Sequence, residues 1–293
     1  MDFYPPENES LMKFFEPSYG SFFVYLFIFL KHYVIIIKTE KGELYMNIFE
    51  KIGNMFKAPK FGDVSAIILC AGSSTRFSNG TQNKQFAEVA GKKVICRTIS
   101  AFQNCKPIRE IILVVKKEDA EEFNNIVCEN NFSKVECIVV GGDTRQISAM
   151  RGFKHVSSKS KYVAFHDGAR CLITSRMIYN IIEEAKKHGA ATAATRVTDT
   201  VKLADNNGFI SKTINREALW NVQTPQIFEK NLYSLCIENA KINGVSATDD
   251  CMLAEAYGQK VKLVDTGKEN IKITVREDIV LAEHILKLRE EEI

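Results

Sequence analysis

The sequence predicts an α/β fold in which a mostly parallel sheet is covered by helices on both faces. From Val64 onward, short apolar runs rich in valine and isoleucine alternate with segments of helical periodicity. Apolar runs of this kind are typical of strands buried on both faces, and their alternation with helices indicates strand–helix–strand units. About 230 of the 293 residues follow Val64, which is enough to bury a sizeable core.

Six apolar segments are expected to be strands. The first three, VSAIILC, EIILVV and VECIVV, are rich in β-branched residues, and KYVAF, AATAATRV and KVKLV follow along the chain. Their ranges are 64–70, 110–115, 135–140, 161–165, 190–197 and 260–264. Because helical patterns separate them, we expect neighbouring strands to run parallel.

Seven segments are expected to be helices, and they lie at 93–104, 117–129, 144–155, 175–188, 230–243, 249–257 and 276–287. The end of the fourth is the best defined. Gly189 follows two lysines and a histidine, and cations stabilise the negative end of the helix dipole while glycine permits the left-handed cap.

Residues 198–223 depart from this alternation. The residues DNNG at 205–208 separate two alternating runs, which is typical of a β-hairpin. A hairpin that leaves a compact domain cannot bury much surface by itself. We therefore expect an arm that packs on another subunit, and hence a homodimer.

The composition excludes some classes of protein. A net charge of +3 with 26% charged residues gives no bulk attraction to nucleic acid. Eight scattered cysteines form no C-x-x-C pair and have no histidine at ligand spacing, so neither a disulfide framework nor a zinc site is predicted. A reducing cytoplasm is the expected location.

The amino-terminal 61 residues differ from the domain expected over 62–293. Their apolar run SFFVYLFIFLKHYVIIIK is broken by Lys31 and His32, so it falls short of the ~20 apolar residues of a membrane span. Three interpretations stay open: a membrane-associating extension through residues 22–37, a poorly ordered tail, or translation that begins at Met46. The internal start is favoured, because the codons for 41–43 can form a purine-rich stretch resembling a ribosome-binding site.

The loop AGSSTR, directly after the first strand, is the strongest functional signal. Gly72 and the short side chains of Ser73, Ser74 and Thr75 leave main-chain N–H groups unshielded, and such a nest binds phosphate oxygens. Arg76 and Lys84 add two cations, which suit a polyphosphate. The loop is neither G-x-G-x-x-G nor a Walker motif, and an ordinary strand-to-helix turn is the alternative.

Two further motifs follow predicted strands. In GGDTR, the paired glycines that include Gly142 permit close approach of a ligand, and Asp143 or Thr144 can cap a helix whose first turn carries Ser148. In HDGAR, Asp167 lies at the carboxyl end of a strand, where open α/β folds bind ligands, and could hold Mg²⁺ or a substrate hydroxyl. The alternatives are a plain capped loop and an ion pair between Asp167 and Arg170.

Weaker candidates lie later in the chain, each at the predicted edge of a strand or helix. They are Thr200, Arg216, Thr224, Thr248 and Lys272. Solvated arginine and lysine are common on any surface, so these residues carry little weight individually.

Taken in order, the segments AGSSTR, NKQ, GGDTRQIS, HDGAR, TDT, NREALWNVQTPQ, ATDD and ENIKIT resemble the 2-C-methyl-D-erythritol 4-phosphate cytidylyltransferase family over 64–288. The resemblance implies a Rossmann-like nucleotidyltransferase fold. It also implies that a phosphate oxygen of the acceptor attacks the α-phosphorus of CTP and that pyrophosphate leaves, with Mg²⁺ bridging the triphosphate.

The resemblance further implies roles for individual residues. Arg76 and Lys84 would stabilise charge at the reacting phosphorus, and Lys272, with the partner subunit's Arg216, would position the acceptor. Residues implied to bind substrates are Ala71, Gly72, Ser73, Gly142, Asp143, Ser148, Asp167, Arg170, Thr200, Thr224 and Thr248, with Asp167 also the expected metal ligand.

Three positions depart from the family pattern. Asn83 and Cys171 stand where proline is common, and Gly168 stands where alanine is common. A cytidylyltransferase for ribitol 5-phosphate or a related pentitol phosphate is the nearest alternative, since it would share the transfer machinery. A membrane-tethered, non-catalytic nucleotide-binding protein is less favoured, because Arg76, Lys84 and Lys272 are all present.

Overall fold

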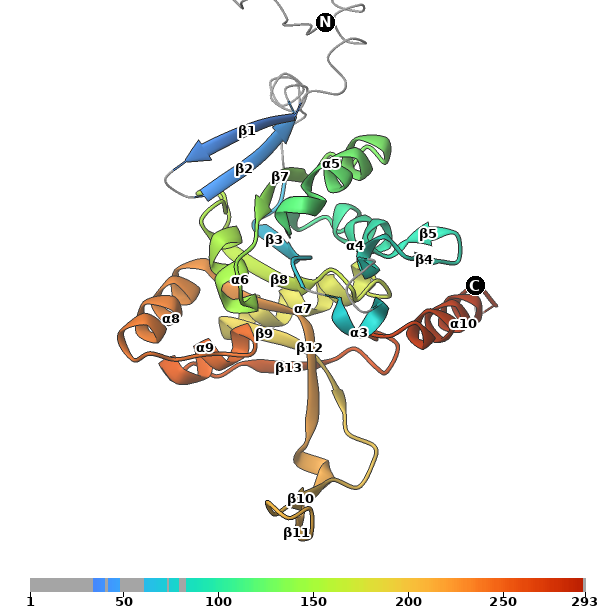
Figure 1. The fold of residues 1–293 in the computed structure, drawn as a ribbon. Coiled ribbons are helices and arrows are strands. Elements are labelled where there is room, and N and C mark those ends of the chain that lie inside the picture. The colour runs from blue at the N-terminus through green and yellow to red at the C-terminus, as the bar shows by residue number, and fades with distance from the viewer. Residues whose placement is uncertain (1–33, 40–41, 48–60, 73, 79–82, 292–293) are drawn as a thin grey trace, which may run out of the picture.

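The computed structural model of the protein describes residues 34–39, 42–47, 61–72, 74–78 and 83–291. One sheet of nine strands forms the centre of this described part. Its strand order is β1-β2-β7-β6-β3-β8-β12-β9-β13 (Figure 1). The strands are β1 (Val34–Thr39), β2 (Gly42–Asn47), β3 (Val64–Leu69), β6 (Ile108–Val115), β7 (Val135–Val140), β8 (Tyr162–Asp167), β9 (Ala190–Arg196), β12 (Trp220–Glu229) and β13 (Lys262–Asp265).

The middle of this sheet is parallel, as the sequence predicts. β3 pairs in parallel with both β6 and β8, and β6 pairs in parallel with β7. β3 is thus flanked by two strands that come later in the chain, so strand order reverses here. The carboxyl ends of β3 and β8 therefore meet where open α/β sheets bind ligands.

Helices cover both faces of the sheet. On one face, α4 (Val94–Gln103), α5 (Ala120–Glu129) and α7 (Ser175–His188) pack on a buried cluster that contains Ile68 and Leu113. On the other, α6 (Arg145–Phe153), α8 (Lys230–Ile242) and α9 (Asp250–Tyr257) pack on a cluster that contains Ile67 and Phe165. Neighbouring residues Ile67 and Ile68 thus face opposite sides, as β geometry requires.

The predicted helices agree closely with the structure. The range 175–188 is α7, and Gly189 caps it in the left-handed region with φ +80° and an N–H that donates to Ala185 at 2.8 Å. The first three residues of the expected 117–129 helix form a 3-10 turn, η3 (Lys117–Asp119), ahead of α5. The last predicted helix is α10 (Glu277–Glu291), which extends four residues beyond the expected range.

β12 corrects the sequence prediction. We expect residues up to 223 to belong to the arm and no strand directly after them, whereas 220–229 form one antiparallel strand between β8 and β9. The register against β9 shifts between Val222 and Gln226. Asn221, Gln223, Pro225 and Gln226 interrupt the apolar pattern there, and proline is rare in central strands, so periodicity could not indicate this one.

The predicted hairpin is confirmed as β10 (Lys202–Ala204) paired antiparallel with β11 (Ile210–Thr213), with Gly208 at φ +84° in the turn. Figure 1 shows this arm extending away from the sheet. Leu203, Phe209 and Ile210 are 55%, 72% and 67% exposed. Three large apolar side chains on one projecting hairpin have no cover within the described chain.

The segment before Val64 is described only in part. β1 and β2 form an antiparallel hairpin, and β2 pairs with the outer edge of β7. Lys31 and His32, which break the apolar run, and most of the segment 22–37 lie outside the described residues. Among the residues described, no helix is long and apolar enough to cross a membrane. The domain boundary near 61 and the start at Met46 stay predictions.

A third cluster joins the carboxyl-terminal helix to the loop after β3. It includes Phe77 from α3 (Thr75–Ser78) and Val89 from the short strand β4 (Glu88–Val89). Ile273, which precedes α10, and Ala282, which lies in α10, also belong to it. β4 pairs with β5 (Lys92–Lys93). The buried side chain of Phe77 therefore anchors the short helix α3, on which Arg76 is exposed.

Candidate active site

A cleft of about 410 Å³ lies at the carboxyl ends of the parallel strands β3, β6, β7 and β8. Eight of the predicted site residues line it, and they are Ala71, Gly72, Lys84, Gly142, Asp143, Ser148, Asp167 and Lys272. The sequence reasoning missed six other lining residues, namely Leu69, Gln85, Lys116, Thr144, Arg145 and Ala169. Motifs from opposite ends of the domain, such as those of Ala71 and Lys272, thus meet in one place.

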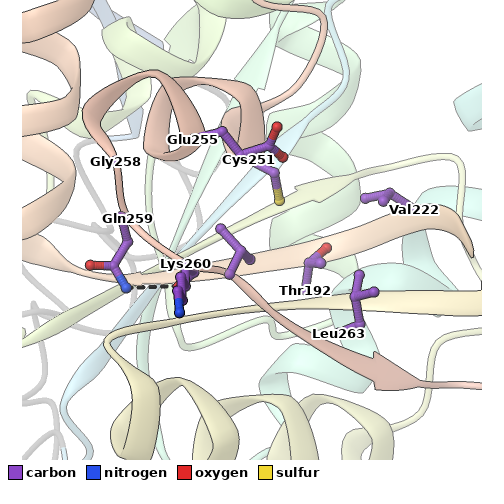
Figure 2. Close-up of a pocket in the computed structure, with 9 residues that line it drawn as sticks. Thr192, Val222, Cys251, Glu255, Gly258, Gln259, Lys260 and Leu263 are labelled. Carbon is purple, nitrogen blue, oxygen red and sulfur yellow. Dashed lines mark hydrogen bonds between the residues drawn. The ribbon is translucent and has the colours of Figure 1, made fainter. Parts of the chain in front are cut away.

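A second cavity, of about 550 Å³, lies among α9, β9, β12 and β13 (Figure 2). Thr192, Val222, Cys251 and Leu263 contribute to its wall, and Lys260 is its only cationic lining residue. None of the predicted site residues borders it. The smaller cleft therefore has the chemistry that an anionic ligand requires.

Two loops form the floor of the cleft by packing closely on each other. A Cβ atom at Gly141 would lie 2.5 Å from the Cβ of Ala71, so only glycine fits there. The Gly142 N–H donates to Ser148 Oγ at 3.0 Å. Ser148 is buried in α6, so this bond ties the loop after β7 to that helix.

Asp167, at the end of β8, is the centre of charge in the cleft. Its Oδ2 accepts from Lys272 Nζ at 2.7 Å, and its Oδ1 lies 3.3 Å from Arg145 Nε. Burial alone would raise the pKa of Asp167, but the positive charges of Lys272 and Arg145 hold it well below its usual range. This carboxylate is therefore ionised at neutral pH.

Lys84 lies in η2 (Lys84–Phe86) and is partly buried. Burial is the main cause that lowers the pKa of its ammonium, and the nearby charge of Lys272 lowers it further, while the carboxylate of Asp167 partly opposes this shift. Asn83 fixes the turn before it, because its Oδ1 accepts from the Gln85 N–H at 3.0 Å and its Nδ2 donates to Asp119 at 2.7 Å. The ammonium of Lys84 is thus partly desolvated and lies near a second cation, Lys272.

His166 and Thr224 hold the backbone of Asp167. His166 is fully buried, and desolvation lowers its pKa to about 3, so the imidazole is neutral. Its Nε2 lies 3.2 Å from the carbonyl oxygen of Arg170 and must donate, so Nδ1 accepts from the Thr224 hydroxyl at 3.1 Å. Thr224 in turn accepts from the Asp167 N–H at 3.0 Å. Both residues position Asp167.

The other predicted residues that the structure describes do not line the cleft. Arg76 is exposed on α3, and Arg170 is partly buried and donates to the carbonyl of Asn270 at 2.8 Å. Thr200, Arg216 and Thr248 are exposed. Arg216 lies in η4 (Arg216–Ala218), at the base of the arm, where it donates to the carbonyl of Thr198 at 2.8 Å. Ser73 lies outside the described residues.

Comparison with known proteins shows the family to which the chain belongs. The family model of 2-C-methyl-D-erythritol 4-phosphate cytidylyltransferase matches residues 64–288. The chain belongs to this family. The 2-C-methyl-D-erythritol 4-phosphate cytidylyltransferase of Desulforamulus reducens is 41% identical over 230 residues, which cover 78% of this chain and 97% of the relative. That of Caldanaerobacter subterraneus is 42% identical over 226 residues, covering 77% and 99%.

Solved structures agree with this assignment. The 4-diphosphocytidyl-2C-methyl-D-erythritol synthase of Anaerococcus prevotii superposes with a TM-score of 0.69 at 33% identity, covering 77% of this chain and 96% of the other. The 2-C-methyl-D-erythritol 4-phosphate cytidylyltransferase of Thermus thermophilus gives 0.61 at 28% identity, covering 77% and 99%. As a member of the cytidylyltransferase family, the chain is a CTP-dependent nucleotidyltransferase, so the predicted fold class, enzyme class and family are confirmed.

Proposed function

We propose that this cleft transfers the cytidylyl group of CTP to 2-C-methyl-D-erythritol 4-phosphate. A phosphate oxygen of the acceptor forms a bond to the α-phosphorus, and the bond from that phosphorus to the bridging oxygen of pyrophosphate breaks. The products are 4-diphosphocytidyl-2-C-methyl-D-erythritol and pyrophosphate. The observation that carries the proposal is the group of Lys84, Lys272 and Arg145 around one ionised carboxylate beside two glycine-lined loops.

The cations account for the catalysis. The acceptor phosphate is already ionised at neutral pH, so the step needs no general base. Lys84 stabilises the negative charge that develops on the reacting phosphorus and on the departing pyrophosphate. Arg76, exposed on α3 near Lys84, adds a second cation by turning toward the bound triphosphate. Because Lys84 is desolvated before the substrate binds, its charge is weakly screened and acts strongly on that phosphorus.

The substrates divide between the two sides of the cleft. The loop residues Ala71, Gly72 and Ser73 receive the triphosphate, while Gly142, Asp143 and Ser148 surround the cytosine. On the acceptor side, Lys272 and Asp167 hold the methylerythritol phosphate, aided by Thr200, Thr248 and the partner subunit's Arg216. Thr224 holds Asp167 from behind by accepting from its N–H, and the carbonyl of Arg170 accepts from His166, the residue before Asp167.

Asp167 is the protein residue that would hold Mg²⁺. Within the described residues, no group of three or more histidine, cysteine, aspartate or glutamate side chains could bind a metal by itself. A single carboxylate with lone pairs to spare fits Mg²⁺, which takes one or two protein carboxylates and completes its shell with phosphate oxygens and water. The ion supplies charge neutralisation of the triphosphate.

A homodimer completes the acceptor side. The exposed Leu203, Phe209 and Ile210 of the arm give it a reason to pack on a second subunit, and Arg216 at its base would then reach the partner's cleft. None of the eight cysteines, all of them within the described residues, forms a disulfide, which fits a reducing cytoplasm as the site of action.

The acceptor is tested by release of pyrophosphate from CTP with methylerythritol phosphate and with ribitol 5-phosphate, each with and without magnesium. We expect a higher kcat/KM for methylerythritol phosphate and loss of activity without the metal. UTP and ATP serve as control nucleotides. A higher kcat/KM for ribitol 5-phosphate would transfer the assignment to the pentitol-phosphate enzymes.

The lowered pKa of Lys84 predicts an alkaline limb in the pH profile. Only the protonated ammonium stabilises the triphosphate, so kcat/KM for CTP is expected to fall as the pH rises through the pKa of Lys84, below the ~10.4 of an ordinary lysine. Bound triphosphate raises this pKa, which moves the limb of kcat to higher pH. Lys84→Arg should remove the limb, because guanidinium stays charged. An unchanged limb in that variant would assign the titration to another group.

A further inference from the structure

Arg145 connects the active-site carboxylate to the interior of the protein. Its Nε faces Asp167 at 3.3 Å, and its Nη1 donates to Asp250 at 2.7 Å. Arg145 is the first residue of α6, and Asp250, 105 positions away, is the first residue of α9. One guanidinium thus holds two carboxylates on two separate elements.

Asp250 is fixed independently of Arg145. It is 1% exposed, and its Oδ1 accepts from the hydroxyl of the fully buried Tyr233 at 2.6 Å. Its own N–H donates to Gln226 Oε1 at 2.8 Å. Because α8 holds the carboxylate of Asp250 and β12 holds its backbone, the position of Asp250 is determined by the core and not by the ligand.

We propose that Arg145 is a positioning residue for cytidylyl transfer, anchored by Asp250 so that it fixes the orientation of Asp167 toward Lys272. The planar fork of arginine donates from two nitrogens in a set geometry, which one ammonium cannot reproduce. With Oδ1 of Asp167 held by Arg145, Oδ2 is left to face Lys272 at 2.7 Å. The chain of contacts runs from Tyr233 through Asp250 and Arg145 to Asp167.

This inference rests on the proposed function, so the wild-type enzyme is assayed first for transfer to methylerythritol phosphate. In that assay, Arg145→Lys and Asp250→Asn are each expected to lower kcat by about 10- to 100-fold, the loss typical of a misplaced reacting group. Arg289→Lys is the matched control, because Arg289 makes an equally short 2.7 Å pair with Glu269 away from the cleft. That control should retain wild-type kcat.

Tyr233→Phe separates positioning from stability. It removes one buried hydrogen bond from Asp250 but leaves the ion pair with Arg145, so we expect a lower Tm with kcat within about threefold of wild type. Arg145→Lys should show the reverse, with a large loss of kcat and little change in Tm. Equal losses of kcat in both variants, in parallel with Tm, would overturn the proposal in favour of a structural ion pair.

A double-mutant cycle gives the decisive readout. If Arg145 acts through Asp167, Arg145→Lys should cost no more than about threefold when introduced into Asp167→Asn, since nothing is then left to orient. The same factor in both backgrounds would show that Arg145 acts by another route. Wild-type kcat in Arg145→Lys would refute the positioning role alone, whereas a wild-type enzyme without transfer would refute the proposed function.

Discussion

Replacing Lys84 with alanine is expected to lower kcat by about 100-fold or more while the affinity for CTP changes only modestly. The ground-state triphosphate still has the main-chain nest and the other cations of the cleft to bind it. The charge that appears on the pentacoordinate phosphorus loses the desolvated ammonium beside it, and the loss of such a pre-placed donor typically costs about 3–4 kcal/mol of transition-state stabilisation.

The measurement is a single-turnover rate at saturating CTP, with the dissociation constant of CTP determined separately by calorimetry. Lys154→Ala, an exposed lysine at the end of α6, controls for the loss of one positive charge and should leave both quantities unchanged. Near wild-type turnover in Lys84→Ala would remove Lys84 from the reaction centre. A large loss of affinity with unchanged kcat would reassign it to ground-state binding.

The sequence could predict most of the sheet and its helices because their signals are local. β3 and β6 are continuous apolar runs, and the end of α7 is determined by Gly189 and the cations before it. The hairpin at Gly208 was predictable for the same reason. β12 was not predictable from the sequence, because its polar residues and Pro225 do not form a strand pattern. It is a strand because it pairs with β8 on one side and β9 on the other.

The cleft was predictable where a motif follows a strand. Lys84, Gly142 and Asp167 come from such motifs, and all three line the cleft. The role of Arg145 was missed although its motif was recognised, because its partner Asp250 is 105 residues away and nothing local indicates that this carboxylate is buried. Interactions across the fold leave no pattern in a single sequence.

Arg216, at the base of the arm, is exposed and lies outside the cleft of its own chain. Its guanidinium donates to the carbonyl of Thr198 at 2.8 Å, and within the part of the chain that the structure describes it forms no ion pair. If the apolar tip of the arm packs on a second subunit, Arg216 acts on the partner's acceptor and each site contains residues from two chains.

Mixing two inactive variants is expected to restore activity if Arg216 acts across the dimer. Lys84→Ala and Arg216→Ala should each be nearly inactive alone. After subunit exchange at equal amounts, half of the dimers are mixed, and each mixed dimer contains one complete site, giving roughly a quarter of the wild-type activity. Adding Phe209→Asp to both chains should abolish the recovery, because a charge on the exposed apolar tip prevents association. If Arg216 served its own chain's cleft, no mixed dimer would contain a complete site, and the mixture would stay as inactive as its components.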